Sequence, residues 1–292
     1  MPSIVGKTAL PDLCYWVTHF TRYKVGILLH IAAVLPACIF GILQFVPIIR
    51  HKFLLYHRIT GYIVFLLLTV SNVGYLLIAD IAEGGDLPTR TFLGFLAIVL
   101  TLMMGMSIYN VRRLQIEQHR NWNLRIFIYT GFVITQRLLQ VIIPLVLTTW
   151  MQIDRQPAMP CAEILWLYDG NITMLAANYP ACEPQNIDTF ASNGYVLVNP
   201  KLGQDVPSTD RARDAAAFNV AFSTAGFLAL VLHAIAAELY IKLTPKTAED
   251  LRAVSYRRQL GRGWKDAGSR GLVAERLGDS YPWEPRGRDV ED

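Results

Sequence analysis

The chain has 292 residues, of which 53% are hydrophobic and 17% are charged, and its formal net charge is +4. A soluble domain carries about 25% charged residues, so this composition excludes an ordinary water-soluble globular protein. The positive charges lie mainly in short connections and in the C-terminal tail. Because no basic patch is interleaved with aromatic residues, nucleic-acid binding is set aside.

The first 24 residues contain large apolar side chains at helical spacing. This spacing predicts a short helix in the membrane interface, with a disordered leader as the alternative. Five apolar stretches follow, each long enough for the roughly 20 residues that cross a bilayer. They cover residues 25–49, 59–79, 91–109, 126–150 and 215–241. The predicted fold class is therefore all-α, a polytopic membrane helix bundle of about five transmembrane helices over 25–241, with the lipid bilayer as its environment.

The charges of the connections favour one orientation, because short cytosolic loops are enriched in Lys and Arg. The first and third connections and the segment after the last span are basic, whereas the second connection is acidic. We therefore expect the N-terminus and the long loop 151–214 outside the cytosol. The tail 242–292 is expected inside, as a disordered or loosely helical appendage.

The long loop is rich in Pro, Asn, Asp and Gly and is too polar to enter lipid. It holds Cys161 and Cys182, whose pairing would close a loop of about 20 residues and contribute roughly 3 kcal/mol; two free thiols are the alternative. Asn171-Ile172-Thr173 is an N-glycosylation sequon, with Asn171 as the acceptor. Together these features predict a multi-pass protein of the endoplasmic reticulum or plasma membrane of a eukaryote.

Histidines in and beside the spans are candidate cofactor ligands. A six-coordinate haem b needs two histidines on facing helices at one depth. His57 and His119, both near the cytosolic boundary, come closest to this and are the candidate ligands of haem iron. His233 requires a helix shift to join them, and His30 lies near the outer surface without a convincing partner. Alternatively, these histidines cap helix ends, donate to backbone carbonyls or contact headgroups.

Arg137 lies near the middle of the fourth stretch, where an arginine costs about 2.5–3.5 kcal/mol on insertion scales. The single carboxylate in the expected spans, Glu238, lies toward the cytosolic end and is expected to be too far away. The candidate partners are therefore backbone carbonyls, Asn72, Gln140, internal water or an anionic ligand. A ligand oxygen held by the planar guanidinium would make Arg137 the most function-sensitive residue of the spans. The alternative is that Arg137 only ties helices together.

Several of these residues form a recurring pattern. It comprises His30, Gly41-Ile42-Leu43-Gln44-Phe45, His57-Arg58-Ile59-Thr60-Gly61, His119-Arg120-Asn121-Trp122 and Arg137. Over residues 28–144 the pattern resembles a membrane family catalogued as domain of unknown function 2306. Asn123 departs from it, since an apolar residue is usual there, and the long loop resembles that of fungal members. The resemblance implies a multi-span fold and no established reaction; its likeness to cytochrome-b-type reductases is analogy.

Three functions fit these observations. The first is a membrane-embedded redox or cofactor-binding protein, with one haem b or a small quinone-like ligand between His57, His119 and Arg137. The second is a non-catalytic polytopic protein, accessory to transport or to a membrane-bound biosynthetic pathway. The third is a small membrane enzyme acting on an isoprenoid or another lipid-like substrate. No GxSxG, HExxH or Walker pattern assigns catalytic residues, so enzymatic activity stays open.

Overall fold

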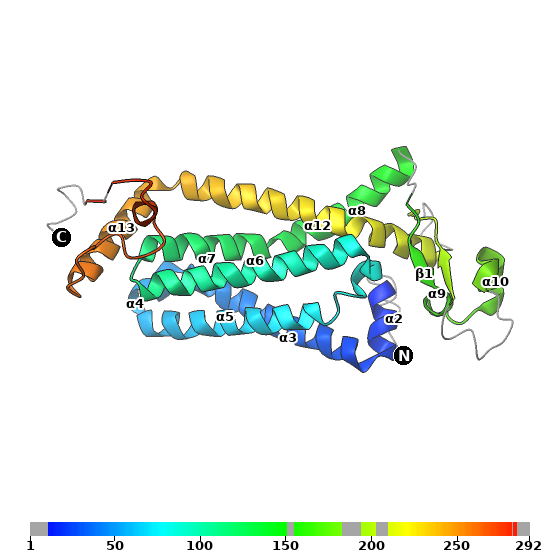
Figure 1. Ribbon diagram of the computed structural model, residues 1–292. Coiled ribbons are helices and arrows are strands. Elements are labelled where there is room, and N and C mark those ends of the chain that lie inside the picture. Colours follow the sequence, from blue (N-terminus) through cyan, green and yellow to red (C-terminus); the bar gives the residue numbers. More distant parts are fainter. Residues whose placement is uncertain (1–10, 151–154, 183–193, 203–209, 282, 285–292) are drawn as a thin grey trace. The chain divides into compact units, whose positions relative to one another are not determined.

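The computed structural model describes residues 11–150, 155–182, 194–202, 210–281 and 283–284. Five helical segments in this part of the chain are long and apolar enough to cross a membrane, which confirms the predicted class. They are Thr21–Gln44, Leu54–Leu76, Leu87–Arg112, Ile116–Val146 and Arg211–Lys242. Three of them are the helices α3, α5 and α6 of Figure 1, and the last is α12. The fourth consists of α7 (Ile116–Thr130) followed by most of α8 (Phe132–Trp150).

The chain divides into two compact units, each described here by itself. The first unit comprises Met1–Phe95 and Ile134–Leu228, and the second comprises Leu96–Val133 and Ala229–Asp292. Both α6 and α12 contribute residues to each unit.

In the first unit, α3 and α5 pack along each other at very close range. The two helices meet at Gly26 and Gly74, and a Cβ atom added to Gly74 would lie 2.6 Å from the backbone nitrogen of His30. Small residues allow this approach, as is usual between membrane helices. Farther along the same pair, the Gln44 side chain donates to Thr60 Oγ1 at 2.6 Å. The short helices α4 (Pro47–Lys52) and η1 (Ala82–Gly85) precede and follow α5.

The leader is helical where the structure describes it, as α2 (Pro11–His19); residues 1–10 lie outside the described residues. Its aromatic side chains cluster with one another and with the segment that follows α8. Tyr15 lies edge-on to Trp166, with ring centroids 6.1 Å apart, and Trp16 stacks on Phe20 at 5.5 Å. The position of α2 in a membrane interface stays a prediction.

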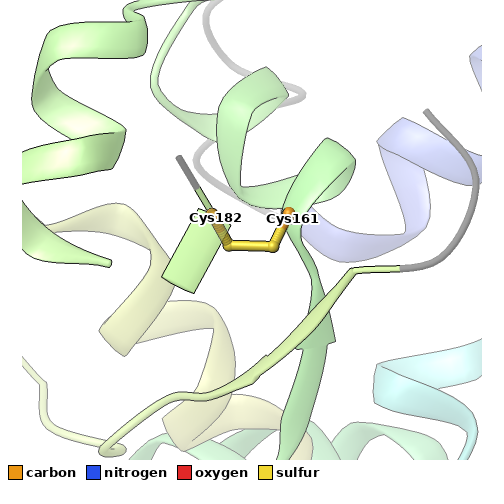
Figure 2. The surroundings of a disulfide bond; sticks show 2 residues. All are labelled: Cys161 and Cys182. Carbon is orange, nitrogen blue, oxygen red and sulfur yellow. A yellow bond between two sulfur atoms is a disulfide. The ribbon is translucent and has the colours of Figure 1, made fainter. Parts of the chain in front are cut away.

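The polar segment between α8 and α12 folds around a core of its own. It contains α9 (Cys161–Leu167), α10 (Ile172–Asn178), η2 (Pro180–Cys182) and an antiparallel pair of strands, β1 (Ala158–Pro160) and β2 (Tyr195–Leu197). Ile164, Leu167 and Leu175 are fully buried in this core. We call it the disulfide segment, because Cys161 and Cys182 are bonded in it (Figure 2).

An aspartate joins the disulfide segment to the start of α12. Tyr168 donates to Asp210 Oδ1 at 2.7 Å, and Tyr179 donates to Oδ2 at 3.4 Å. The same carboxylate accepts from the backbone nitrogen of Arg213 in the first turn of α12. Burial, together with Asp210, raises the pKa of both tyrosines, so they remain donors at neutral pH.

In the second unit, the described part of the tail is folded. Helix α13 (Pro245–Leu260) and the short η3 (Ala274–Leu277) follow α12. Ser255 Oγ accepts from the backbone nitrogen of Ile116, and Gln259 donates to the carbonyl of Arg113 at 3.0 Å. The tail, which the sequence leaves as disordered or loosely helical, thus contains α13 and η3 within residues 245–281, and buried polar side chains rather than an apolar stripe hold it. Residues 285–292 lie outside the described residues.

Candidate functional site

The most distinctive polar cluster of the first unit centres on Arg137 of α8. Its Nη1 atom donates to Glu83 Oε1 at 2.9 Å and to Gln140 Oε1 at 2.7 Å. The guanidinium also lies over the ring of Phe222, 5.6 Å from the centroid. We call these four residues the Arg137 cluster. One face of the guanidinium is covered, yet 47% of the Arg137 side chain is exposed, against 10% for Glu83.

Glu83 reaches Arg137 from an unusual backbone conformation. It lies in η1, the connection between α5 and α6, with φ 47° and ψ 56°, in the left-handed region. For a residue other than glycine this conformation costs of the order of 1 kcal/mol or more, and such residues persist where the surrounding structure holds them. The surrounding structure therefore holds Glu83 in this strained turn, with its carboxylate bonded to Arg137.

Amide side chains around the cluster bind α8 to α12. Gln136 donates to the carbonyl of Phe222 at 3.4 Å, and Gln140 donates to that of Phe218 at 3.3 Å. Nearby, the buried Asn219 packs on Gly84, and its Oδ1 atom has no hydrogen-bond partner among the described residues. An unsatisfied buried acceptor costs about 1–3 kcal/mol, so this region has capacity for a further donor.

The sequence identified Arg137 and its partner Gln140 but missed Glu83. Glu83 lies in the acidic second connection, outside the expected spans, and the sequence predicts Arg137 near mid-membrane with no carboxylate within reach. The ion pair instead puts the guanidinium at the level of the connection where α5 ends and α6 begins. The missed signal was the acidic connection Asp80–Asp86, with two glycines that let it turn back. Glu238, as expected, does not serve Arg137; it pairs with Arg125 at 2.6 and 2.9 Å.

Three of the candidate histidines bond to the backbone of a neighbouring helix through Nδ1. His30 lies 3.2 Å from the carbonyl of Ser71, His119 3.0 Å from that of Ser107, and His233 2.7 Å from that of Ile128. Donation to a carbonyl ties two helices together, which the alternative interpretation expected. The same bond also assigns the proton to Nδ1, as in histidines that bind metals through Nε2.

The proposed haem ligands lie in different units. His57 belongs to the first unit, and its buried Nδ1 atom has no hydrogen-bond partner among the described residues. His119 belongs to the second unit, where Ser107 Oγ lies 2.9 Å from its Nδ1. Asn123, the departure from the family pattern, donates to Ser107 Oγ at 2.8 Å and to the carbonyl of His119 at 2.7 Å. The pairing of His57 with His119 stays a prediction.

The disulfide segment presents the sequon on its surface. Asn171, Ile172 and Thr173 are all exposed. Asn171 caps α10, with its Oδ1 accepting from the backbone nitrogen of Met174 at 3.0 Å. The pairing of Cys161 with Cys182 is confirmed. In the described part of the chain, no three or more His, Cys, Asp or Glu side chains gather as a metal site would require, which leaves a two-histidine haem site untested.

Five helices of spanning length with polar side chains bonded between them define an integral, multi-pass membrane protein. Residues 27–161 match the family described as "Predicted membrane protein (DUF2306)", so the resemblance seen in the sequence is confirmed. This segment contains Arg137 and all of the candidate histidines except His233. Comparison with curated proteins and with solved structures finds no match.

Proposed function

We propose that this membrane protein binds a small lipid-soluble ligand, quinone-like in its polar group, through Arg137. The observation that supports this is an arginine whose Nη1 is held by Glu83 and Gln140 while nearly half of its side chain is exposed. The N–H groups that Glu83 and Gln140 leave free can donate to an oxygen atom of a bound ligand. Because Glu83 already compensates the charge, the pair suits a neutral carbonyl acceptor better than a second anion.

The test is binding of a short-chain ubiquinone analogue to the purified full chain, measured through the quenching of tryptophan fluorescence. Arg137→Lys is expected to weaken binding at least about tenfold, because an ammonium cannot reproduce the fork of the guanidinium. Arg155→Lys is the matched control: Arg155 pairs with Asp86 at 2.8 Å in the same unit but lies outside the cluster. The affinity of the Arg155→Lys variant for the analogue should stay at the wild-type value.

The same variants distinguish the alternative, a non-catalytic protein in which Arg137 only ties helices. In that case Arg137→Lys and Arg137→Gln would lower the melting temperature in detergent, and the affinity per folded molecule would stay unchanged. That result would refute the ligand-binding role.

Haem b with His57 and His119 as its ligands, the pairing that the sequence suggests, is the second candidate. Because the two histidines lie in different units, this candidate rests on the sequence and not on any geometry between them. Purified protein expressed with adequate haem supply would show a Soret band that shifts on reduction and is lost in His57→Ala and His119→Ala. A colourless protein removes this candidate, and haem that survives both substitutions shows that the ligands are others.

We also propose the orientation that the loop charges indicate. The disulfide segment lies outside the cytosol, where disulfides persist and Asn171 can be glycosylated, and α13 lies on the cytosolic side. Residence in the endoplasmic reticulum or plasma membrane of a eukaryote follows from the same features. A bonded cystine pair beside an exposed sequon supports this proposal.

A further inference from the structure

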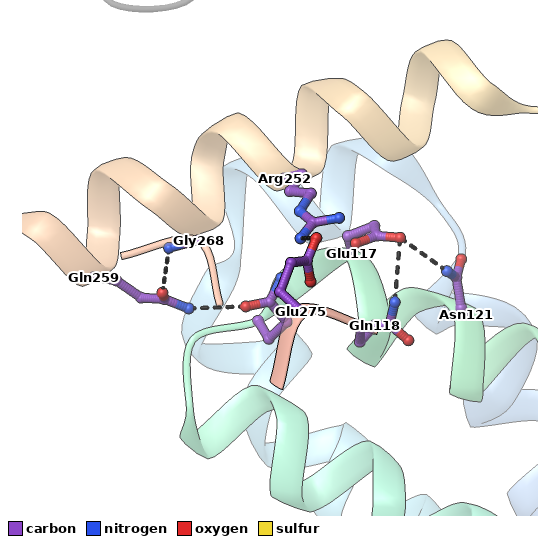
Figure 3. Close-up of polar contacts among 8 residues, drawn as sticks. Glu117, Gln118, Asn121, Arg252, Gln259, Gly268 and Glu275 are labelled. Carbon is purple, nitrogen blue, oxygen red and sulfur yellow. Dashed lines mark hydrogen bonds and ion pairs between the residues drawn. The ribbon is translucent and has the colours of Figure 1, made fainter. Parts of the chain in front are cut away.

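Three ionisable side chains from three elements of the second unit meet in a buried cluster, shown in Figure 3. Glu117 belongs to α7, Arg252 to α13 and Glu275 to η3. Arg252 donates from Nη2 to Oε1 of Glu275. The side-chain amides of Gln118 and Asn121 donate to Oε1 of Glu117, each at 3.3 Å. Glu117 also interacts electrostatically with both Arg252 and Glu275.

With all three side chains ionised, the cluster has two negative charges and one positive charge. Glu117 is only 8% exposed, and the side chains of Glu275 and Arg252 are 9% and 18% exposed. Two carboxylates therefore share a single guanidinium away from water. The second oxygen, Oε2, of each carboxylate is buried and has no hydrogen-bond partner among the described residues. An uncompensated charge in such a position is costly, and buried groups neutralise themselves by protonation instead.

We infer that the Glu117–Glu275 pair binds one proton while the tail is docked on α7. The proton brings the net charge of the cluster to zero and turns one acceptor-only carboxylate into a donor. A divalent cation would need several more oxygen ligands than this pair supplies. The described residues also contain no group of three acidic, histidine or cysteine ligands.

The docked tail consequently holds one more proton than a released tail. When α13 and η3 leave α7, both carboxyl groups enter water, where a glutamate is ionised above about pH 4.3. Docking is therefore strongest at low pH and weakens as the pH rises. Loss of one proton on release changes the equilibrium by up to about tenfold per pH unit until the docked pair itself ionises.

Two backbone hydrogen bonds between the tail and the helices beneath it report docking without involving the acidic pair. The amide of Ile116 donates to Ser255 Oγ at 2.8 Å, and the amide of Leu272 donates to Asn110 Oδ1 at 2.9 Å. Hydrogen exchange of these two amides should be measured on the full chain in detergent, from about pH 6 to about pH 9, as protection relative to the intrinsic exchange rate.

In the wild-type protein we expect this protection to fall as the pH rises, by up to about tenfold per unit. Glu117→Gln is uncharged at every pH and should make the protection nearly independent of pH. Asp250→Asn, an exposed acid on α13, is the matched control and should behave like wild type. A wild-type protein without the pH dependence, or a Glu117→Gln variant that retains it, would overturn the inference.

Glu275→Gln provides a second variant with the same expected result if Glu117→Gln does not fold. If neither folds, the infrared spectrum of the wild-type protein decides. A protonated-carboxyl band at neutral pH that disappears on alkalinisation supports the shared proton, and its absence refutes it.

Discussion

Polar side chains inside the helices mostly bond to a neighbouring helix. His30 and His233 reach backbone carbonyls, Gln44 reaches a hydroxyl, and Arg125 makes a two-pronged contact with Glu238. Such bonds are worth about 0.5–2 kcal/mol each between membrane helices, so several are needed to fix a helix pair. Arg137 differs because its side chain stays 47% exposed although its Nη1 atom bonds to Glu83 and Gln140.

Asn123 allows a prediction about a single residue. Asn123→Leu would install the apolar residue usual in the family and remove donors from Ser107 Oγ and the carbonyl of His119. We expect a loss of about 1–2 kcal/mol, seen as a lower melting temperature in detergent. In a Ser107→Ala background the effect should be smaller, because one bond is already absent. An unchanged or higher melting temperature would show that Asn123 gives no net stabilisation.

At the scale of elements, hydropathy predicts the helices that face lipid and misses those held by polar contacts. The apolar runs predict the five spans, but two helices begin several residues before their runs. Helix α5 begins at Leu54, ahead of the run 59–79, and α7 begins at Ile116, ahead of the run 126–150. Residues such as His57 and Glu117 belong to these helices although their side chains lower the hydropathy. For the same reason the sequence indicates only a disordered or loosely helical tail where α13 forms, since Ser255 and Gln259 occupy its buried face.

The disulfide provides a prediction about an element. Replacing Cys161 and Cys182 by serine removes a link across 21 residues and should lower the free energy of unfolding of the disulfide segment by about 3 kcal/mol. Hydrogen exchange should report it at the amide of Cys161, which donates to the carbonyl of Gly194 at 2.8 Å.

Cys38→Ser is the control, since Cys38 is a free cysteine on α3 and should leave that protection unchanged. Alkylation of both Cys161 and Cys182 in unreduced, denatured protein would contradict the bridge itself.

For the whole molecule, the sequence predicts how many times the chain crosses the membrane but not how its polar contacts are made. The five stretches correspond to five spanning helices, since each needs only length and apolar composition. The Arg137–Glu83 contact depends on a backbone turn with three consecutive left-handed residues, which neither hydropathy nor helical phase describes. Glu83 for that reason escaped the candidate list, whereas Gln140, three residues from Arg137 on one helix, did not.

Orientation yields the last prediction. If the disulfide segment is outside the cytosol, the protein expressed in eukaryotic cells should lose mass on glycosidase treatment, and Asn171→Gln should abolish that loss. A tag in the disulfide segment should be accessible from the non-cytosolic side, and a tag at the C-terminus from the cytosol. Cytosolic accessibility of the tag in the disulfide segment would reverse the orientation.

The position of the disulfide segment in the chain also sets the order in which its parts are synthesised. Both cysteines are synthesised before α12, so the covalent bridge can form on a nascent protein. The buried core of the segment, however, includes Ala212, Ala215 and Ala216 from the first turns of α12. The core can therefore close only after the first turns of α12 have been synthesised. A chain that ends before α12 would carry the disulfide but lack part of this core.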